Sequence, residues 1–536
     1  MTTEVLNKGF FALIFSGMFA WVIFERDSDS DMDCNRQRYL PYISGLLLPS
    51  CILAILSMEL IFTGRESAMK MTLAFCFGVF LHICLYYLLL MPALPFLRRL
   101  ISARACAVLW MLPNYLYLTQ LSYMRLPGPR WVIEVPLTLV QILLILWLIG
   151  FLAVLGWKII SHLTFRARIL RSASPIADST VLTIWHQEIE TARFRKPKFK
   201  LVASPAIHTP LSVGLFQRSV RVVLPKRDYT PEELALIFRH ELIHIGREDS
   251  WNKFFLIFCS AMCWFNPLMW MAVKRSFEDL ELSCDETVLL DSDDDTKRRY
   301  ADLLLKTAGD EQGFTTCLSA SANTLRYRLK SVVDSKRKPS GALVVGLMFF
   351  LLCMSCGYVA LAYGESTGAD VIYKSQPPEQ YTLRSIESGV FICTDETALR
   401  CYLSDLRMEH ISGNYSFEQE GRSLSLIFDA PEGVAVVTLS DRFIKLVPLY
   451  GSRARAEYFY LPNRTDWDVL NEFIVERPVW NVHATGTDEE YGQDFTAVLS
   501  HVSIIEGHHR KTLYGMSSRE IPGGIFGYQA SQAALC

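Results

Sequence analysis

The chain has 536 residues, of which 51% are hydrophobic and 20% are charged. This length allows two or three domains, and the mixture of apolar and charged residues is typical of a protein with membrane spans and water-exposed parts. The net charge of −2 gives no sign of the basic surface that binds nucleic acid, so we expect no direct nucleic-acid binding.

Apolar runs long enough to cross a bilayer, which takes about 20 residues each, dominate the first third of the chain. They predict a transmembrane bundle over residues 1–157 with spans near 9–24, 40–63, 71–96, 101–122 and 131–157. A further transmembrane helix is predicted at 341–363. The first run could instead be a signal peptide, but no small-residue cleavage site follows it, so we favour a retained anchor.

Lysine and arginine clusters predict the orientation of these spans. Basic residues gather after the fifth span, before the last span, and between the third and fourth spans. Because basic loops stay in the cytoplasm, residues 158–340 are expected to form a cytoplasmic domain. The N-terminus and residues 364–536 would then lie outside, and the protein would be a multi-pass protein of the cytoplasmic membrane.

The expected cytoplasmic domain contains short β-rich runs followed by a well-marked helix. The runs are 198–204, 211–216 and 220–225, which indicates an α+β domain. Thr230 then precedes Pro231 at the first helical position and Glu233 three residues after the cap, which is a capping box. We predict a helix from Pro231 to about Gly246.

This helix carries the motif His240-Glu-Leu-Ile-His244. Residues four apart share a helix face, so both imidazoles can bind one Zn²⁺. Glu241 is offset by one residue, which suits a base that takes a proton from the attacking water rather than a ligand. The alternative is a pair of stacked surface histidines, which the capping box and the preceding strands make less favoured.

A second helix, starting at Asn266-Pro267, offers a third ligand. Glu281 and Asp285 lie four residues apart on one face. We expect Glu281 to bind the metal and Asp285 to orient a ligating histidine, with Glu278 as the competing ligand. Cys284 has core spacing. The alternative is that these carboxylates are solvated on an amphipathic helix.

Alternating apolar runs mark the last part of the chain. The runs 423–428, 434–439 and 443–449 are separated by turn residues, so residues 364–536 are expected to form a β-rich α+β domain. Cys393 and Cys401 are candidates for a disulfide bond in an oxidising compartment.

Taken together, these motifs resemble the BlaR/MecR-type membrane metallopeptidases, which are gluzincin antirepressors of β-lactam sensing. The matching residues run from about 160 to 330 and are Ser204-Pro-Ala-Ile, Pro210, Gly214, Val222, Leu224-Pro225, the HELIH motif, Asp249, Asn266-Pro267, Glu281 and Cys284-Asp285. The resemblance implies a multi-domain protein with an α-helical transmembrane bundle, a cytoplasmic α+β gluzincin metalloprotease domain and a β-rich α+β extracytoplasmic domain. It also supports one zinc on His240, His244 and Glu281, with Glu241 as base.

In function, the resemblance implies a signal transducer of the bacterial inner membrane. An outer domain would sense a signal, the bundle would transmit it, and the zinc domain would cleave a cytoplasmic target, expected to be a winged-helix repressor, with self-cleavage as an option. Tyr300 is a candidate oxyanion donor, and a dimer is one option for the oligomeric state. The alternatives are a housekeeping protease that clears misfolded membrane proteins and a catalytically weak receptor.

Two features depart from the β-lactam sensors. The chain has more candidate spans than their usual four. Acylation by a β-lactam also needs a serine in Ser-x-x-Lys, and none occurs in residues 364–536. The pattern occurs elsewhere at Ser67, Ser250 and Ser335, where we attribute it to chance. We therefore expect the protein to sense a different signal without forming a covalent β-lactam adduct.

Overall fold

The computed structural model of the chain divides into two units, Met1–Val475 and Glu476–Cys536. It describes residues 3–28, 47–62, 65–117, 126–194, 197–216, 218–290, 292–308, 322–333, 338–386, 391–412, 415–416, 422–430, 433–448, 457–476, 505–506 and 509–510. Residues 40–46, 63 and 118–122 of the predicted spans lie outside these ranges, as does Ser335. In the second unit, the described residues beyond Glu476 form one antiparallel pair, β17 (Ile505–Glu506) and β18 (His509–Arg510).

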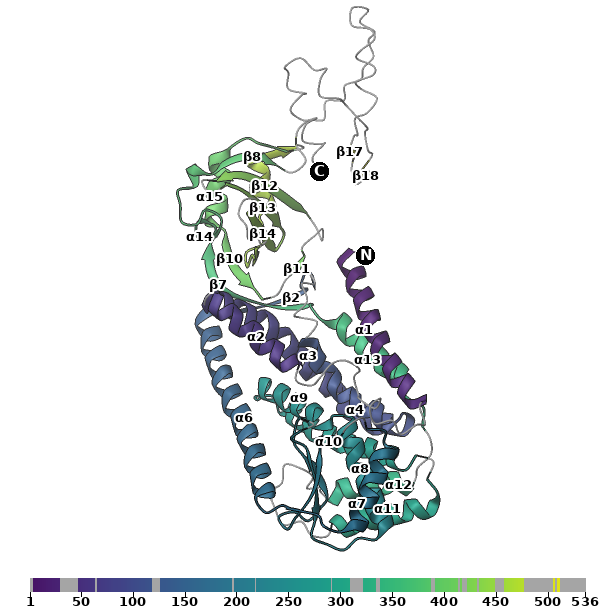
Figure 1. Cartoon of the computed structure of the whole chain (residues 1–536). Helices are drawn as coiled ribbons and strands as arrows, with labels where there is room; N and C mark the ends of the chain where they lie inside the picture. The colour runs from purple at the N-terminus through teal and green to yellow at the C-terminus, as the bar shows by residue number, and fades with distance from the viewer. Residues whose placement is uncertain are drawn as a thin grey trace, which may run out of the picture. The chain divides into compact units, whose positions relative to one another are not determined.

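Three helices are long and apolar enough to cross a membrane, so the chain is a membrane protein. They are α1 (Thr3–Ser28), α3 (Arg65–Leu100) and α6 (Leu137–Arg171). Two shorter apolar helices accompany them, α2 (Leu47–Phe62) and α13 (Ala342–Ser355). Helix α13 packs along α1, and α2 packs on α3 (Figure 1).

The predicted span at 101–122 has a different structure. Here a nine-residue helix, α4 (Ala103–Met111), passes into the 3₁₀ helix η2 (Leu112–Tyr115) at Pro113. Nine residues of α-helix extend only about 14 Å, which is less than half the thickness of a hydrocarbon core. Its side chains are buried against other helices rather than left open to lipid. Hydropathy predicts apolar surroundings, but it does not distinguish lipid from protein.

The ends of two other predicted spans also differ. The predicted span at 131–157 begins as strand β2 (Trp131–Val135), and α6 runs through the expected boundary at residue 157 to Arg171. The predicted helix at 341–363 is the 14-residue α13, and the chain then enters strand β7 (Val359–Thr367). Both apolar runs therefore combine part of a helix with a strand.

Strands β2 and β7 belong to an eight-stranded sheet with the order β2-β7-β10-β15-β14-β13-β12-β8. The β2–β7 pair is parallel, and the other neighbours are antiparallel. The remaining strands are β10 (Arg407–Ile411), β15 (Glu457–Tyr460), β14 (Phe443–Pro448), β13 (Gly433–Ser440), β12 (Ser423–Ala430) and β8 (Thr382–Ile386). Strands β12, β13 and β14 are the three runs predicted from the alternating pattern.

Smaller elements accompany this sheet. Helix α15 (Glu396–Asp405) contributes Leu399 and Leu403 to its core. The others are α14 (Gly368–Val371), η3 (Pro378–Gln380), α16 (Trp467–Phe473), and the two-stranded sheets β1 (Leu126–Pro127) with β11 (Tyr415–Ser416) and β9 (Phe391–Cys393) with β16 (Ile474–Glu476). The two cysteines considered for a disulfide, Cys393 and Cys401, are both free thiols.

After α6 the chain forms a four-stranded sheet, ordered β3-β4-β6-β5, and a set of helices (Figure 1). The strands are β3 (Ser174–Pro175), β4 (Lys200–Ser204), β5 (Leu211–Val213) and β6 (Arg221–Pro225). The helices are α7 (Ser179–Thr191), α8 (Pro231–Gly246), α9 (Asp249–Met262), α10 (Pro267–Val288), α11 (Asp294–Ala308) and α12 (Ala322–Val333). The three predicted β-rich runs correspond to β4, β5 and β6, which confirms that prediction.

Candidate metal centre

Helix α8 begins as the sequence predicts. The backbone N–H of Glu233 donates to Thr230 Oγ1 at 3.3 Å, and Glu233 Oε2 accepts from the Thr230 N–H at 2.9 Å. This capping box fixes where the helix starts. One apolar face of α8 packs on α7, where the Phe238 and Trp185 rings lie 5.0 Å apart. The helix is thus held firmly on one side while its histidines face the other.

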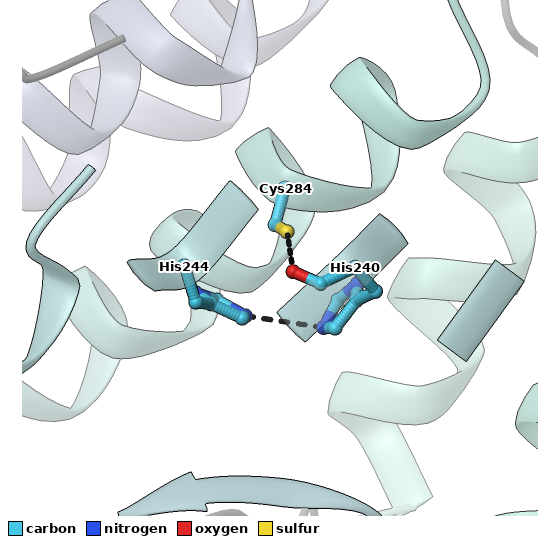
Figure 2. A group of neighbouring side chains, drawn as sticks. All are labelled: His240, His244 and Cys284. Atoms are coloured by element: carbon cyan, nitrogen blue, oxygen red, sulfur yellow. Dashed lines mark hydrogen bonds between the residues drawn. The ribbon is translucent and has the colours of Figure 1, made fainter. Parts of the chain in front are cut away.

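His240 and His244 point toward one another from successive turns of α8 (Figure 2). Their Nε2 atoms are 3.1 Å apart. Residues four apart on a helix are neighbours on one face, which accounts for this approach. Glu241, between them in sequence, is also buried. The motif is therefore folded as a helix with paired imidazoles.

Helix α10 brings Glu281 to the same point. Its Oε2 atom lies 3.6 Å from His240 Nε2 and 3.5 Å from His244 Nε2. This buried oxygen has no hydrogen-bond partner among the described residues. A tetrahedral ion with ligand distances of 2.0–2.1 Å needs ligand atoms about 3.4 Å apart. The three atoms therefore fit the donor set of a tetrahedral metal ion, and Glu281 rather than Glu278 supplies the oxygen.

Cys284 is a second candidate for the third donor. One ligand atom from each of His240, His244 and Cys284 lies within 4.8 Å of the others. However, the Cys284 thiol donates to the backbone carbonyl of His240, with a sulfur–oxygen distance of 3.4 Å (Figure 2). The residue also belongs to the hydrophobic core under α8, as its spacing predicts. Glu281 Oε2 lies 3.5–3.6 Å from both imidazole nitrogens and has no hydrogen-bond partner among the described residues, so it fits the role better.

The outer nitrogens of both imidazoles meet fixed acceptors. His244 Nδ1 lies 2.6 Å from Asp249 Oδ2. His240 Nδ1 lies 3.0 Å from the Tyr300 hydroxyl, which itself donates to Asp285 Oδ1 at 2.6 Å. An Nδ1–H that donates to these oxygens leaves the Nε2 lone pair free. Both imidazoles are thus oriented with their ligand nitrogens toward the centre.

Two of these partners differ from the sequence prediction. Tyr300, considered as an oxyanion donor, contacts the Nδ1 side of His240 and is buried, so its hydroxyl is not placed for that role. Asp285 Oδ1 lies 3.5 Å from His240 Nδ1, so the tyrosine bridges the contact expected to be direct.

The sequence indicates Asp249 only as part of the family pattern, and the structure shows that it is the partner of His244. It begins α9 directly after Glu248, whose φ of 57° lies in the left-handed region. This turn brings the aspartate back to the preceding helix. An acidic residue five positions after the second histidine is the signal in the sequence that could have suggested the contact.

Comparison with known proteins assigns this part of the chain to a family. Residues 132–332 match the family model described as BlaR1 peptidase M56. These residues, called the M56 domain below, are similar to BlaR/MecR-type M56 peptidases. The match begins at β2 and ends in α12, so it includes all of α6.

Two curated proteins are similar to this chain over part of their length. The "Regulatory protein BlaR1" of Bacillus licheniformis is 28% identical over 184 residues, which cover 34% of this chain and 30% of that protein. The "Methicillin resistance mecR1 protein" of Staphylococcus aureus is 28% identical over 118 residues, or 21% of this chain and 20% of that protein. The chain thus matches less than a third of either relative.

Charges around the imidazoles of the M56 domain are strongly coupled. Burial raises the pKa of Glu281, but His244 and Lys253 outweigh it and hold the pKa well below its usual value. Burial lowers the pKa of His240, but Cys284 and Glu281 outweigh it and raise the pKa to about 10. Lys253 Nζ lies 3.2 Å from Glu281 Oε1, which leaves Oε2 toward the histidines. The ionised Glu281 carboxylate therefore favours positive charge at this point, whether protonated imidazoles or a metal ion that displaces their protons.

Proposed function

We propose that the protein is a zinc metalloendopeptidase of the bacterial inner membrane that transduces a signal by proteolysis. In this proposal His240, His244 and Glu281 bind one zinc ion and Glu241 is the general base. The single observation that supports it is the set of three donor atoms, 3.1–3.6 Å apart. One of them is a buried carboxylate oxygen for which the residues that the structure describes supply no hydrogen-bond partner.

The residues around the centre have distinct roles in the proposed reaction. When bound, zinc would supply a Lewis acid that polarises a water molecule and the scissile carbonyl. Glu241 takes the proton of the attacking water on its carboxylate and passes it to the leaving amine. Asp249 and Tyr300 hold the imidazoles in one orientation, so the reacting groups are positioned before the substrate arrives.

The proposed substrate is a cytoplasmic protein, namely a winged-helix repressor, and the protease itself is a further target. This follows from the family relatives, one of which is a regulatory protein, and from the basic clusters that favour a cytoplasmic M56 domain. In the same proposal residues 364–536 lie outside and act as a sensor. A sheet-rich part after α13 favours sensing over the housekeeping alternative, which needs no such part.

The metal assignment is tested on the full chain purified in detergent. The wild type should hold about one zinc per chain, and His240→Ala should lose it. Glu241→Gln should keep the zinc but lower cleavage of the repressor by about 10²–10⁴-fold, because the base is not a ligand. Glu232→Gln, an exposed glutamate on the same helix, is the matched control and should retain both properties. Unchanged zinc in His240→Ala would show that the assignment is wrong.

The proposed orientation has its own test. Alkaline phosphatase fused after residue 370 should be active because it would be exported, whereas a fusion near residue 320 should be inactive. The reverse pattern would exclude a cytoplasmic substrate. It would leave the metal site unaffected, so the two proposals can fail separately.

The nature of the signal can be narrowed by labelling. Because residues 364–536 contain no Ser-x-x-Lys, a fluorescent penicillin should form no stable adduct with them. An adduct mapped to a serine in this range would restore β-lactam sensing. Without one, the signal must act by binding one state of the receptor better than another.

A further inference from the structure

Arg328 is a buried arginine on α12, in a part of the M56 domain that no sequence motif marks. Its Nε donates to Asp285 Oδ2 at 2.7 Å, and its Nη2 donates to Asp285 Oδ1 at 2.7 Å. Both residues are buried, with exposed fractions of 9% for Arg328 and 1% for Asp285. A two-pronged contact between a guanidinium and a carboxylate fixes both the distance and the plane of the partner.

A short chain of contacts leads from this ion pair to a proposed ligand. The Tyr300 hydroxyl donates to the same Asp285 Oδ1 at 2.6 Å and lies 3.0 Å from His240 Nδ1. Arg328, Asp285, Tyr300 and His240 lie on α12, α10, α11 and α8, in that order. Four helices are therefore joined by polar contacts that end on one imidazole.

Arg328 also lies close to Glu281, the proposed metal ligand on α10. Its Nη1 lies 4.0 Å from Glu281 Oε2, the oxygen assigned to the metal. An arginine cannot shed its proton in a protein, so its charge is permanent at this position. A pair that merely joined α12 to α10 would need neither the contact through Tyr300 nor this proximity to Glu281.

We propose that Arg328 is a positioning residue of the metal centre. It holds Asp285 and, through it, Tyr300, so that His240 keeps Nδ1 protonated and presents Nε2 to the metal. Loss of the guanidinium frees Asp285 to rotate, and the tyrosine then loses its acceptor. This inference rests on the proposed metal site, and it adds to that site a residue 43 positions from Asp285 in the chain.

The test measures metal binding and needs no substrate. Zinc affinity of the full chain in detergent is measured by competition with a chromophoric chelator, and Co²⁺ loading gives a visible spectrum that reports on ligand geometry. Arg328→Gln should weaken zinc binding by about 10–100-fold, the usual cost of losing a group that orients a ligand, and should change the cobalt spectrum. Arg326→Gln, an exposed arginine on the same helix, should change neither.

Two further variants separate positioning from folding. Arg328→Lys keeps the charge without the two-pronged contact and should recover only part of the affinity. Tyr300→Phe leaves the ion pair intact and should weaken zinc binding about tenfold. If Arg328→Gln does not fold, the zinc affinity of Tyr300→Phe is the deciding measurement. A wild-type zinc affinity in Tyr300→Phe overturns the inference. A folded Arg328→Gln with wild-type affinity and spectrum overturns it as well, whereas a wild type that binds no zinc overturns the proposed function itself.

Discussion

The two halves of helix α10 lie in different hydrophobic cores. Met269, Ala272 and Leu280 pack with the membrane helices, whereas Cys284 and Val288 pack in the core of the M56 domain. The helix thus begins among the membrane helices and ends in the M56 domain. This domain is therefore not a separate globule joined to the membrane helices by a linker.

Two buried acids near the middle of α10 show what this difference means. Residues two apart point in nearly opposite directions on a helix, so Asp279 and Glu281 face different cores. Asp279 meets Arg98 of α3 at 2.8 Å and accepts from the Trp110 indole at 2.6 Å. Glu281 instead has one oxygen between two imidazoles that has no hydrogen-bond partner in the described part of the chain. Asp279 is thus held by an ion pair and a hydrogen bond between helices, whereas Glu281 presents an oxygen to a cation.

The largest effect is expected from replacing Glu281, the acid between the two imidazoles. Glu281→Gln should weaken zinc binding by more than about 100-fold and abolish proteolysis, because groups that only orient a ligand already cost 10–100-fold. Chelator competition measures the affinity, and Glu278→Gln is the control on the same helix. If Glu278→Gln weakens binding and Glu281→Gln does not, the competing ligand is the correct one.

Removing the ion pair between Asp279 and Arg98 should affect stability rather than metal binding. Asp279→Asn leaves the Arg98 guanidinium buried without its counter-charge, which should cost about 3 kcal/mol of unfolding free energy. Thermal unfolding in detergent measures this loss, and the zinc content should stay near one per chain. Equal loss of zinc in Asp279→Asn and Glu281→Gln would show that the two acids do not have separate roles.

The raised pKa of His240 predicts a pH dependence of metal binding. Its pKa is about 10 in the folded, metal-free protein against an ordinary value of 6.5. The protonated imidazole therefore stabilises the metal-free fold below about pH 6.5, and this contribution is lost as the pH rises through 10. Burial lowers the pKa of His244 as well, but Cys284 and Glu281 outweigh it and hold this pKa well above its ordinary value. Zinc must displace the protons of both imidazoles, so its apparent affinity should rise at least about tenfold per pH unit between pH 7 and 9. A flat profile in chelator competition would contradict the raised pKa.

The smallest effect is expected where α10 begins. Trp264 donates its indole N–H to the Trp147 carbonyl of α6 at 3.2 Å, and Trp147 donates to the Met262 carbonyl at 2.7 Å. Trp264→Phe removes one of these bonds and should lower the unfolding free energy by about 1 kcal/mol. Zinc affinity should not change. A metal-binding defect in this variant would show that the corner between α9 and α10 also shapes the site.

Helix α8 and the proposed ligand on α10 could be predicted because their determinants are local. The cap at Thr230, the interval between His240 and His244, and the position of Glu281 within its own helix all follow from helical spacing. The pattern therefore identified the elements that the structure brings together. It gave Asp285 the right neighbourhood but missed the tyrosine through which it reaches His240.

What the sequence could not supply depends on tertiary geometry. Arg328 reaches Asp285 across 43 residues, and no interval within one helix marks such a contact. Asp249 reaches His244 only because Glu248 turns the chain through a left-handed conformation. The apolar run at 101–122 predicted a transmembrane span for a related reason. Helix α4 in this run is apolar because protein, not lipid, surrounds it. Burial by protein and burial by lipid leave the same composition.

Strand β2 restricts how this chain can be cut or recombined. It is contributed by residues 131–135, yet it pairs along β7, more than two hundred residues later in the chain. A fragment that starts at residue 364 would begin inside β7 and lack this neighbour, which exposes a sheet edge that can pair with other molecules. The eight-stranded sheet therefore cannot be exchanged by replacing the C-terminal part of the chain alone, because β2 comes from residues 131–135. A hybrid with a different sheet would have to replace both stretches of chain together.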